Sequence, residues 1–286
     1  IKLLKFIYNI KISNKHYLMK YQIGIQCPID SSISLFKNDK IIECVEEERF
    51  KRIKGDKPSF PDLSLKYIIN KYNLTNKNVS CINFAAYGGE INNKLYDKKI
   101  KIIQSENEKF SKIIKNRLIS EDSKKRIKIF EKWVKKYFKK VKINYLDHHL
   151  SHAASAFLSS KFNDSVIFTL DGRGNLKSGT VTYGNKKKKI FNELDFNTTL
   201  ESIGFIYGQT TEILGFKPHR HEGKLTGLAA YGNYKKTIKI FDKAFTFKKK
   251  RFVPNFNLYQ PYNISQNKIF RKSLKKFKRE DVAAGC

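Results

Sequence analysis

The spacing of apolar and polar residues along the chain predicts a mixed α/β fold. Alternating positions, or short apolar runs between turn residues, predict strands at 21–27, 33–36, 40–49, 79–87, 142–147 and 165–175. A hairpin with a polar KKKK tip is predicted over 179–194. Apolar residues at helical spacing predict helices over 60–74, two more within 104–140, and others over 149–160, 200–216 and 222–233. Strands and hairpins therefore come first, and helices separate the later strands, without a repeat of roughly 20–50 residues.

Two of these segments carry more specific expectations. The strand at 165–175 is strongly apolar, which predicts a buried strand, and it ends in the acidic, Gly-rich sequence DGRGN, which predicts a turn. The helix over 200–216 is expected to end at Gly215, because glycine readily adopts the left-handed conformation that closes a helix.

The composition supports a folded chain that does not cross a membrane. The 286 residues are enough for one large domain or two ordinary ones, and the 40% hydrophobic content is enough to build a core. No apolar stretch reaches about 18 residues, which excludes a membrane-spanning helix. The four cysteines have no CxxC spacing, which argues against a zinc ribbon or a disulfide framework and favours a cytoplasmic location.

The net charge of +32 suggests nucleic acid as a ligand, but the residue choice argues against it. Only nine of the 58 basic residues are arginine, and the lysines are spread along the whole chain. Lysine is accompanied by abundant isoleucine and asparagine, as A/T-rich codons produce. We therefore do not expect nucleic acid to be the main ligand.

The first residues raise a question about the native start. Met19 is the only methionine, and it stands directly before the first predicted strand. We therefore expect residues 1–18 to be a non-native or disordered leader and residues 19–286 to form the domain.

Two motifs are candidates for a metal site. His148 and His152 are four residues apart, so both imidazoles share one face of the predicted helix and could reach one ion, whereas His149 points about 100° away. Asp171 ends the apolar strand and could supply a carboxylate ligand. The simpler alternatives are surface or capping histidines and an ordinary β-turn.

Two further motifs could bind an anion. Asp30, Ser31 and Ser32 form a polar turn between two strands, which is how phosphate is held in sugar-kinase and actin-like ATPases. A second cluster combines charged residues with glycines and comprises Glu222, Gly223, Lys224, Gly227 and Gly232. It could form a loop and helix that close over an anionic ligand, or it could simply be a connector. The glycines after Asp171, Gly172 and Gly174, could likewise bring backbone N–H groups to a phosphate.

Five stretches in order give the sequence a family resemblance from about residue 21 to the end. They are IGIQCPIDSSISLF, EEERFKRIKGD, DHHLSHAASAFLSS, FTLDGRGN and SIGFIYGQTTEILGFKPHRHEGKLTGLAAYG. Together they resemble the N-terminal domain of the carbamoyltransferases that include NodU-type nodulation proteins and antibiotic O-carbamoyltransferases.

The resemblance implies an actin-like/sugar-kinase type ATPase domain with a defined chemistry. Such enzymes use ATP, with Mg, and carbamoyl phosphate to form a carbamoyl-adenylate, and then transfer the carbamoyl group to a hydroxyl of a small-molecule acceptor. The family's HxxxH pair and following aspartate hold a metal, commonly iron, and map onto His148, His152 and Asp171. Catalytic roles are implied for Lys54, facing carbamoyl phosphate, and Asp30. Nucleotide or phosphate binding is expected at Ser31, Ser32, Gly172, Gly174 and Lys224.

Two departures from the family pattern leave alternatives open. Ile29 stands where the family has a histidine before Asp30 and Ser31, and isoleucine cannot move a proton. The family domain also continues with an adenosine-binding half and a separate C-terminal domain, so we expect this chain to lack half of the ATP cleft. The alternatives are a non-catalytic metal- or nucleotide-binding remnant, or a relative of the tRNA threonylcarbamoyl-transfer proteins.

Overall fold

The computed structural model describes residues 20–27, 30–38, 40–54, 60–85, 101, 123–248, 251–259 and 267–286. The expected leader, Ile29 and the first of the two helices expected within 104–140 lie outside these residues. The chain divides into two compact units. The first lies within Ile1–Ile91, Glu121–Ile167 and Thr182–Leu194, and the second within Asn92–Ser120, Phe168–Val181 and Asp195–Cys286.

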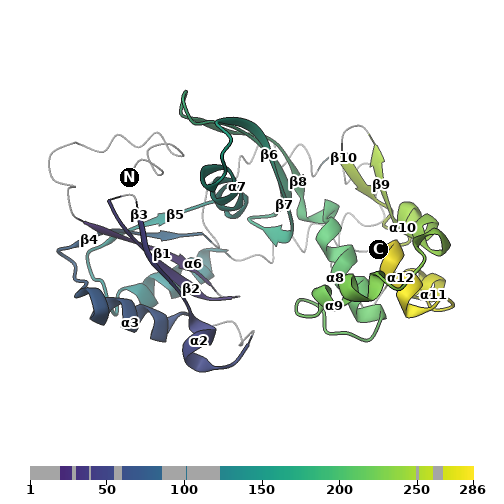
Figure 1. Ribbon diagram of the computed structural model, residues 1–286, viewed down its shortest axis with the longest axis horizontal. Coiled ribbons are helices and arrows are strands. Elements are labelled where there is room, and N and C mark those ends of the chain that lie inside the picture. Colours follow the sequence, from purple (N-terminus) through teal and green to yellow (C-terminus); the bar gives the residue numbers. More distant parts are fainter. Residues whose placement is uncertain are drawn as a thin grey trace. The chain divides into compact units, whose positions relative to one another are not determined.

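The first unit is built on a mixed five-stranded sheet with the order β3-β2-β1-β4-β5 (Figure 1). Its strands are β1 (Tyr21–Gln26), β2 (Ser32–Lys37), β3 (Lys40–Glu46), β4 (Val79–Phe84) and β5 (Lys142–Tyr145). Neighbours β1, β2 and β3 pair antiparallel, whereas β4 pairs parallel with both β1 and β5. The carboxyl ends of β1, β4 and β5 therefore lie at one edge of the sheet.

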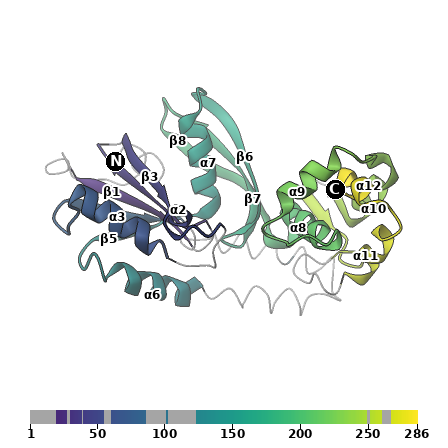
Figure 2. The same cartoon turned by 60° about the horizontal axis from the view of Figure 1, so that its bottom comes forward.

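One face of this sheet carries the core of the first unit. Apolar residues at every second position of β1, such as Ile23 and Ile25, pack with helices α3 (Asp62–Tyr72) and α6 (Ser123–Val134), which Figure 2 shows beside the sheet. The helical spacing predicted α3, whose buried residues include Leu65 and Ile68, and the helix ends at Asn73 in the left-handed conformation. The α/β prediction is confirmed for this unit.

The strand predicted over 40–49 is wrong at its end. Strand β3 stops at Glu46, and residues Glu47–Lys51 form a short helix, α2, which ends at Arg52 with φ +57°. Glutamate, arginine and lysine favour helix over strand, and the run EER has no alternating apolar partner to hold it in the sheet.

A second sheet has three strands in the order β6-β7-β8. They are β6 (Asp164–Gly174), β7 (Lys177–Asn185) and β8 (Ile190–Thr198), and they include the predicted hairpin. Each strand has residues in both compact units. Within the first unit, helix α7 (His148–Ser159) packs through Ala153 and Phe157 against Ile167 and Phe191.

Two expectations for β6 are wrong. The strand is not buried on both faces, because Val166, Phe168 and Leu170 are 51%, 71% and 66% exposed, although they alternate with buried residues. The sequence DGRG is not a turn, because the strand continues to Gly174 and the chain turns at Asn175 and Leu176, which both have positive φ. An apolar run cannot by itself show whether both faces of a strand are covered.

The second unit is mainly helical. Its core includes Ile206, Leu225, Phe241, Phe270 and Val282. Helix α8 (Ile203–Ile213) is followed by Gly215 at φ +79°, as predicted. The remaining elements are η2 (Thr199–Glu201), α9 (Glu222–Ala229), η3 (Tyr234–Lys236), α10 (Ile238–Ala244), β9 (Phe245–Lys248), β10 (Arg251–Pro254), α11 (Lys268–Leu274) and α12 (Arg279–Gly285). Among the residues described, no helix has both the length and the apolar character needed to cross a membrane.

Candidate metal centre

Helix α7 begins directly after β5. The backbone N–H of Leu146 donates to the carbonyl of Phe84 at 2.7 Å, which extends the pairing beyond the strand. The buried Asp147 is then the N-cap of α7, and its carboxylate accepts the N–H of Leu150 at 2.9 Å. This cap makes His148 the first residue of the helix.

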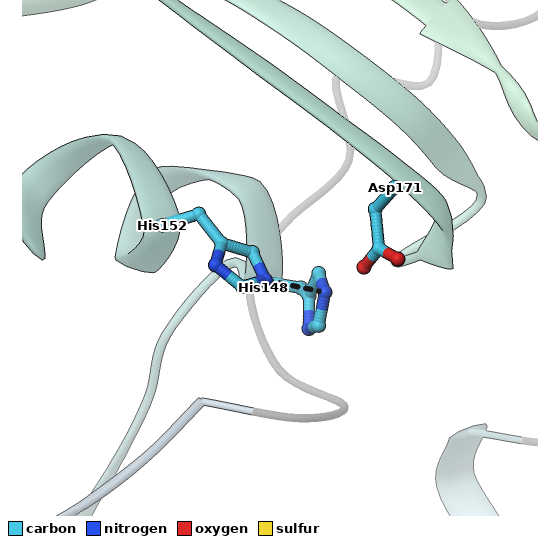
Figure 3. A group of neighbouring side chains, drawn as sticks. All are labelled: His148, His152 and Asp171. Atoms are coloured by element: carbon cyan, nitrogen blue, oxygen red, sulfur yellow. Dashed lines mark hydrogen bonds between the residues drawn. The ribbon is translucent and has the colours of Figure 1, made fainter. Parts of the chain in front are cut away.

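The two predicted histidines meet on the surface of α7. The Nε2 atoms of His148 and His152 are 3.1 Å apart, along the dashed line in Figure 3, and the ring centroids are 4.6 Å apart. This contact follows from the spacing of four residues, which places both side chains on one face of the helix. His149 lies outside the pair, because its ring is fully buried.

Asp171 of β6 completes the cluster. Figure 3 shows its carboxylate directed toward the ring of His148. One ligand atom from each of His148, His152 and Asp171 lies within 4.8 Å of the other two. The Oδ1 atom of Asp171 also accepts the backbone N–H of Gly172 at 2.5 Å, which restricts the orientation of the carboxylate.

The donor set suits a transition-metal ion. Nitrogen ligands bind such ions at about 2.0–2.1 Å, so two of them on one ion are about 2.9–3.4 Å apart at angles of roughly 90–109°. The 3.1 Å between the two Nε2 atoms falls in this range. Two histidines and one carboxylate are typical of non-haem iron(II) and of catalytic zinc, and they leave coordination positions open for a ligand.

The backbone of Asp171 is held by the start of α8. The hydroxyl of Ser202, the N-cap of α8, donates to the carbonyl of Gly172 at 2.7 Å and approaches that of Asp171 at 3.3 Å. Gly204 lies so close that a Cβ atom there would be 2.7 Å from the nitrogen of Gly172. Ser202 and Gly204 are not among the residues predicted for the site, although a serine before a helix and a glycine inside it are visible signals in the sequence.

The predicted phosphate turn lies at the carboxyl edge of the first sheet. Asp30 is exposed at φ +48°, Ser31 is buried, and Ser32 begins β2. The turn follows β1 and His148 follows β5, with β4 between these two strands. Two strand spacings correspond to roughly 10 Å, so the turn and the start of α7 belong to the same edge of the sheet.

The remaining predicted residues are more dispersed. Lys54 is exposed three residues after the end of α2. In α9, the Nζ of Lys224 lies 5.9 Å from the ring centroid of Phe216. Packing explains the glycine at position 232, because a Cβ there would lie 1.9 Å from the carbonyl oxygen of Glu280. Gly172 and Gly174 belong to the strand β6 rather than to a turn.

Comparison with known proteins identifies the family. Residues 21–285 match the model described as the carbamoyltransferase N-terminus. The chain is 30% identical to the uncharacterised protein MJ1051 of Methanocaldococcus jannaschii over 73% of this chain and 33% of that protein. It is 29% identical to the nodulation protein NolNO of Sinorhizobium fredii over 71% of this chain and 28% of that protein. For the uncharacterised protein sll1178 of Synechocystis the identity is 29%, over 77% of this chain and 36% of that protein. The chain thus spans about a third of the length of these relatives, and it belongs to the carbamoyltransferase family.

Proposed function

We propose that this chain supplies the carbamoyl-phosphate- and nucleotide-binding part of an O-carbamoyltransferase with an actin-like/sugar-kinase type ATPase fold. In the proposed reaction, water releases phosphate from carbamoyl phosphate, and the resulting carbamate displaces pyrophosphate from ATP to give a carbamoyl-adenylate. A hydroxyl of a small-molecule acceptor then takes the carbamoyl group, and AMP leaves. The observation that carries the proposal is the convergence of His148, His152 and Asp171 in a chain of this family.

The three converging residues would hold a divalent cation, with iron the first candidate. The imidazoles bind as neutral ligands, while Asp171 contributes one negative charge, so a bound dication keeps a net positive charge. When bound, such a cation would supply positive charge to nearby phosphate oxygens. These residues would hold the cation, with both histidines supplied by one face of α7 and the carboxylate by β6.

The strand–turn–strand of β1 and β2 supports a phosphate site at the sheet edge where α7 begins. Ligands of open α/β sheets bind at the carboxyl ends of parallel strands, which is where the turn Asp30–Ser32 and the start of α7 both lie. The hydroxyls of Ser31 and Ser32 are the proposed phosphate donors, and Lys54 adds a positive charge for carbamoyl phosphate. Asp30 is the proposed proton acceptor at this turn.

The nucleotide, bound with Mg²⁺, is assigned to the second unit. Gly172 and Gly174 lack a Cβ on the segment that carries Asp171, and among the described residues a Cβ at Gly172 would meet only the ring of Phe205, at 3.9 Å. This leaves room for a ligand to approach the backbone of β6. Lys224 of α9 is the proposed cation for its phosphates.

Metal analysis tests the proposal. The protein, incubated with iron(II) under reducing conditions and desalted, should retain about one ion per chain by mass spectrometry of the metal content. The substitutions H148A and D171A should each reduce this content at least tenfold, because each removes one of three ligands. His219→Ala is the matched control, since this exposed histidine belongs to a different segment. Equal metal content in all four proteins would refute the assignment.

Carbamoyl phosphate binding tests the second half of the proposal. Calorimetric titration should show binding that weakens when Lys54 is replaced by alanine. Wild-type protein that holds iron but binds no carbamoyl phosphate would contradict the proposed site at Asp30–Ser32.

A second candidate function is favoured by Ile29. A chain without the family's histidine at this position could bind the metal and phosphate ligands without transferring the group. If the wild-type protein binds these ligands without transferring the carbamoyl group, Ile29→His should raise carbamoyl transfer. Transfer by the wild-type protein would exclude this alternative.

A further inference from the structure

Glu47, the first residue of α2, has a buried carboxylate in an unusual position. Only 3% of the residue is exposed. Its Oε1 accepts the backbone N–H of Leu63 at 3.1 Å, and its Oε2 accepts both the N–H and the hydroxyl of Ser64 at 2.8 Å. A buried glutamate needs such partners, because an unpaired charge in the interior is strongly destabilising.

These bonds cap a helix from outside it. Helix α3 starts at Asp62, and its N-cap residue, Pro61, makes no side-chain cap hydrogen bond. Leu63 and Ser64 are the second and third residues of α3, whose N–H groups an N-cap side chain normally accepts. Glu47 takes that role across 16 residues of sequence, and its charge also suits the positive end of the helix dipole.

The backbone of the same residue contacts the predicted phosphate turn. The N–H of Glu47 donates to the carbonyl of Ser31 at 2.8 Å. Helix α2 then leads through Arg52, in the left-handed conformation, to Lys54. One buried residue therefore joins the turn after β1, the start of α3 and the segment that carries Lys54.

We propose that Glu47 is a positioning residue for carbamoyl phosphate binding: its carboxylate anchors α2 to the start of α3, and its backbone N–H thereby holds Ser31 in place. This inference rests on the proposed function. Glu47 does not touch the ligand. Its replacement loosens the turn and the Lys54 segment together, so that affinity falls while the metal centre on α7 keeps its ligands.

The test compares two substitutions at the same end of α3. Glu47→Gln keeps the volume of the side chain but removes its negative charge. It also places an amide NH₂ group, itself a donor, against the N–H groups of Leu63 and Ser64. The matched control is Asp62→Asn, because Asp62 begins α3 and accepts the indole N–H of Trp133 and the hydroxyl of Tyr137, both at 2.7 Å. Far-UV circular dichroism reports whether each variant is folded, because Asp62→Asn alters the acceptor of the Trp133 indole N–H and would change the tryptophan fluorescence directly.

Calorimetry with carbamoyl phosphate and hydrogen exchange at the amide of residue 47 are the two readouts. We expect E47Q to raise the dissociation constant about tenfold, to speed exchange, and to leave the metal content unchanged, while D62N stays within about twofold in affinity. The shorter Glu47→Asp, which keeps the charge, should recover part of the affinity.

Three results would overturn the role of Glu47. Equal affinity losses in E47Q and D62N would show only a general loss of helix stability. Unchanged affinity in a folded E47Q would remove the positioning role directly. Wild-type protein that binds no carbamoyl phosphate would instead refute the proposed function, and the role of Glu47 in binding with it.

Discussion

The contact between α8 and the segment that carries Asp171 can be tested by adding one methyl group. In Gly204→Ala the new Cβ would lie 2.7 Å from the nitrogen of Gly172 and 2.8 Å from the carbonyl carbon and oxygen of Asp171. All three are backbone atoms, so no side-chain rotation can relieve the overlap. Either α8 or β6 must move.

The size of the movement follows from these distances. Atoms in favourable contact are about 3.5–4.0 Å apart, so the overlap requires a shift of roughly 0.8 Å. Overpacking of this kind costs about 1–3 kcal/mol of unfolding free energy. Metal–ligand distances tolerate only about 0.2 Å, so a displaced Asp171 should also lower metal affinity, by about 10–100-fold.

The assay pairs urea unfolding with metal titration, and Gly208→Ala provides the control. Gly208 lies one turn further along α8, and among the described residues outside its own helix a Cβ there would meet only the flexible carboxylate of Glu222, at 3.7 Å. G208A should therefore be neutral or more stable by about 0.4–1 kcal/mol, since alanine favours the helix, and should keep its metal affinity. A G204A protein as stable and as metal-competent as G208A would refute the reasoning.

Three further outcomes are expected from other parts of the molecule. Hydrogen bonds from a lysine ammonium and a backbone amide lower the pKa of Asp281, so its contribution to stability is complete above about pH 5 and lost as the pH falls below 4. In unfolding titrations, D281N should therefore be less stable than wild type at pH 7, with the difference shrinking toward pH 3. Gly232→Ala should destabilise the protein, because its Cβ would overlap the backbone of α12. Gly227→Ala should stabilise α9 by about 1 kcal/mol, because within the described part of the chain a Cβ there meets nothing outside its own helix within 4 Å; equal melting temperatures would contradict this. Burial raises the pKa of Cys27 to about 12, so at pH 8 a thiol reagent should modify the exposed Cys44 and reach Cys27 only after unfolding, as peptide mass mapping would show.

Local patterns along the chain were sufficient for most elements and for the histidine pair. The helical spacing of Leu65 and Ile68 predicted α3, and the spacing of four residues between His148 and His152 predicted a shared face of α7. Both relations depend only on the geometry of a single helix, so they need no knowledge of what packs against it. The ordered motifs also indicated the family, which the match over residues 21–285 confirms.

Patterns failed where a segment's environment comes from elsewhere in the chain. The apolar run of β6 predicts a buried strand, but such a run does not reveal whether a neighbour covers the second face of the strand, and Phe168 is exposed. The sequence pattern predicts that the strand continues through the glutamates before Arg49. In the structure Glu47 instead belongs to α2, and its carboxylate caps α3, which starts 15 residues later. The residues next to β6 in the sequence do not show whether its second face is covered, and the residues next to Glu47 do not show that it caps α3.

The sequence by itself determined the α/β class, the family and the identity of three metal-ligand candidates. Only the tertiary structure decided that Asp171 meets the two histidines, that the phosphate turn and α7 belong to one edge of the first sheet, and that Ser202 and Gly204 hold the backbone of Asp171. The physical reason is the distance along the sequence between the residues that interact. Backbone periodicity and capping act over a few residues, whereas the contacts of Asp171 and Gly172 join residues that are 19 to 33 positions apart, and the turn and α7 share an edge only because β4 lies between β1 and β5.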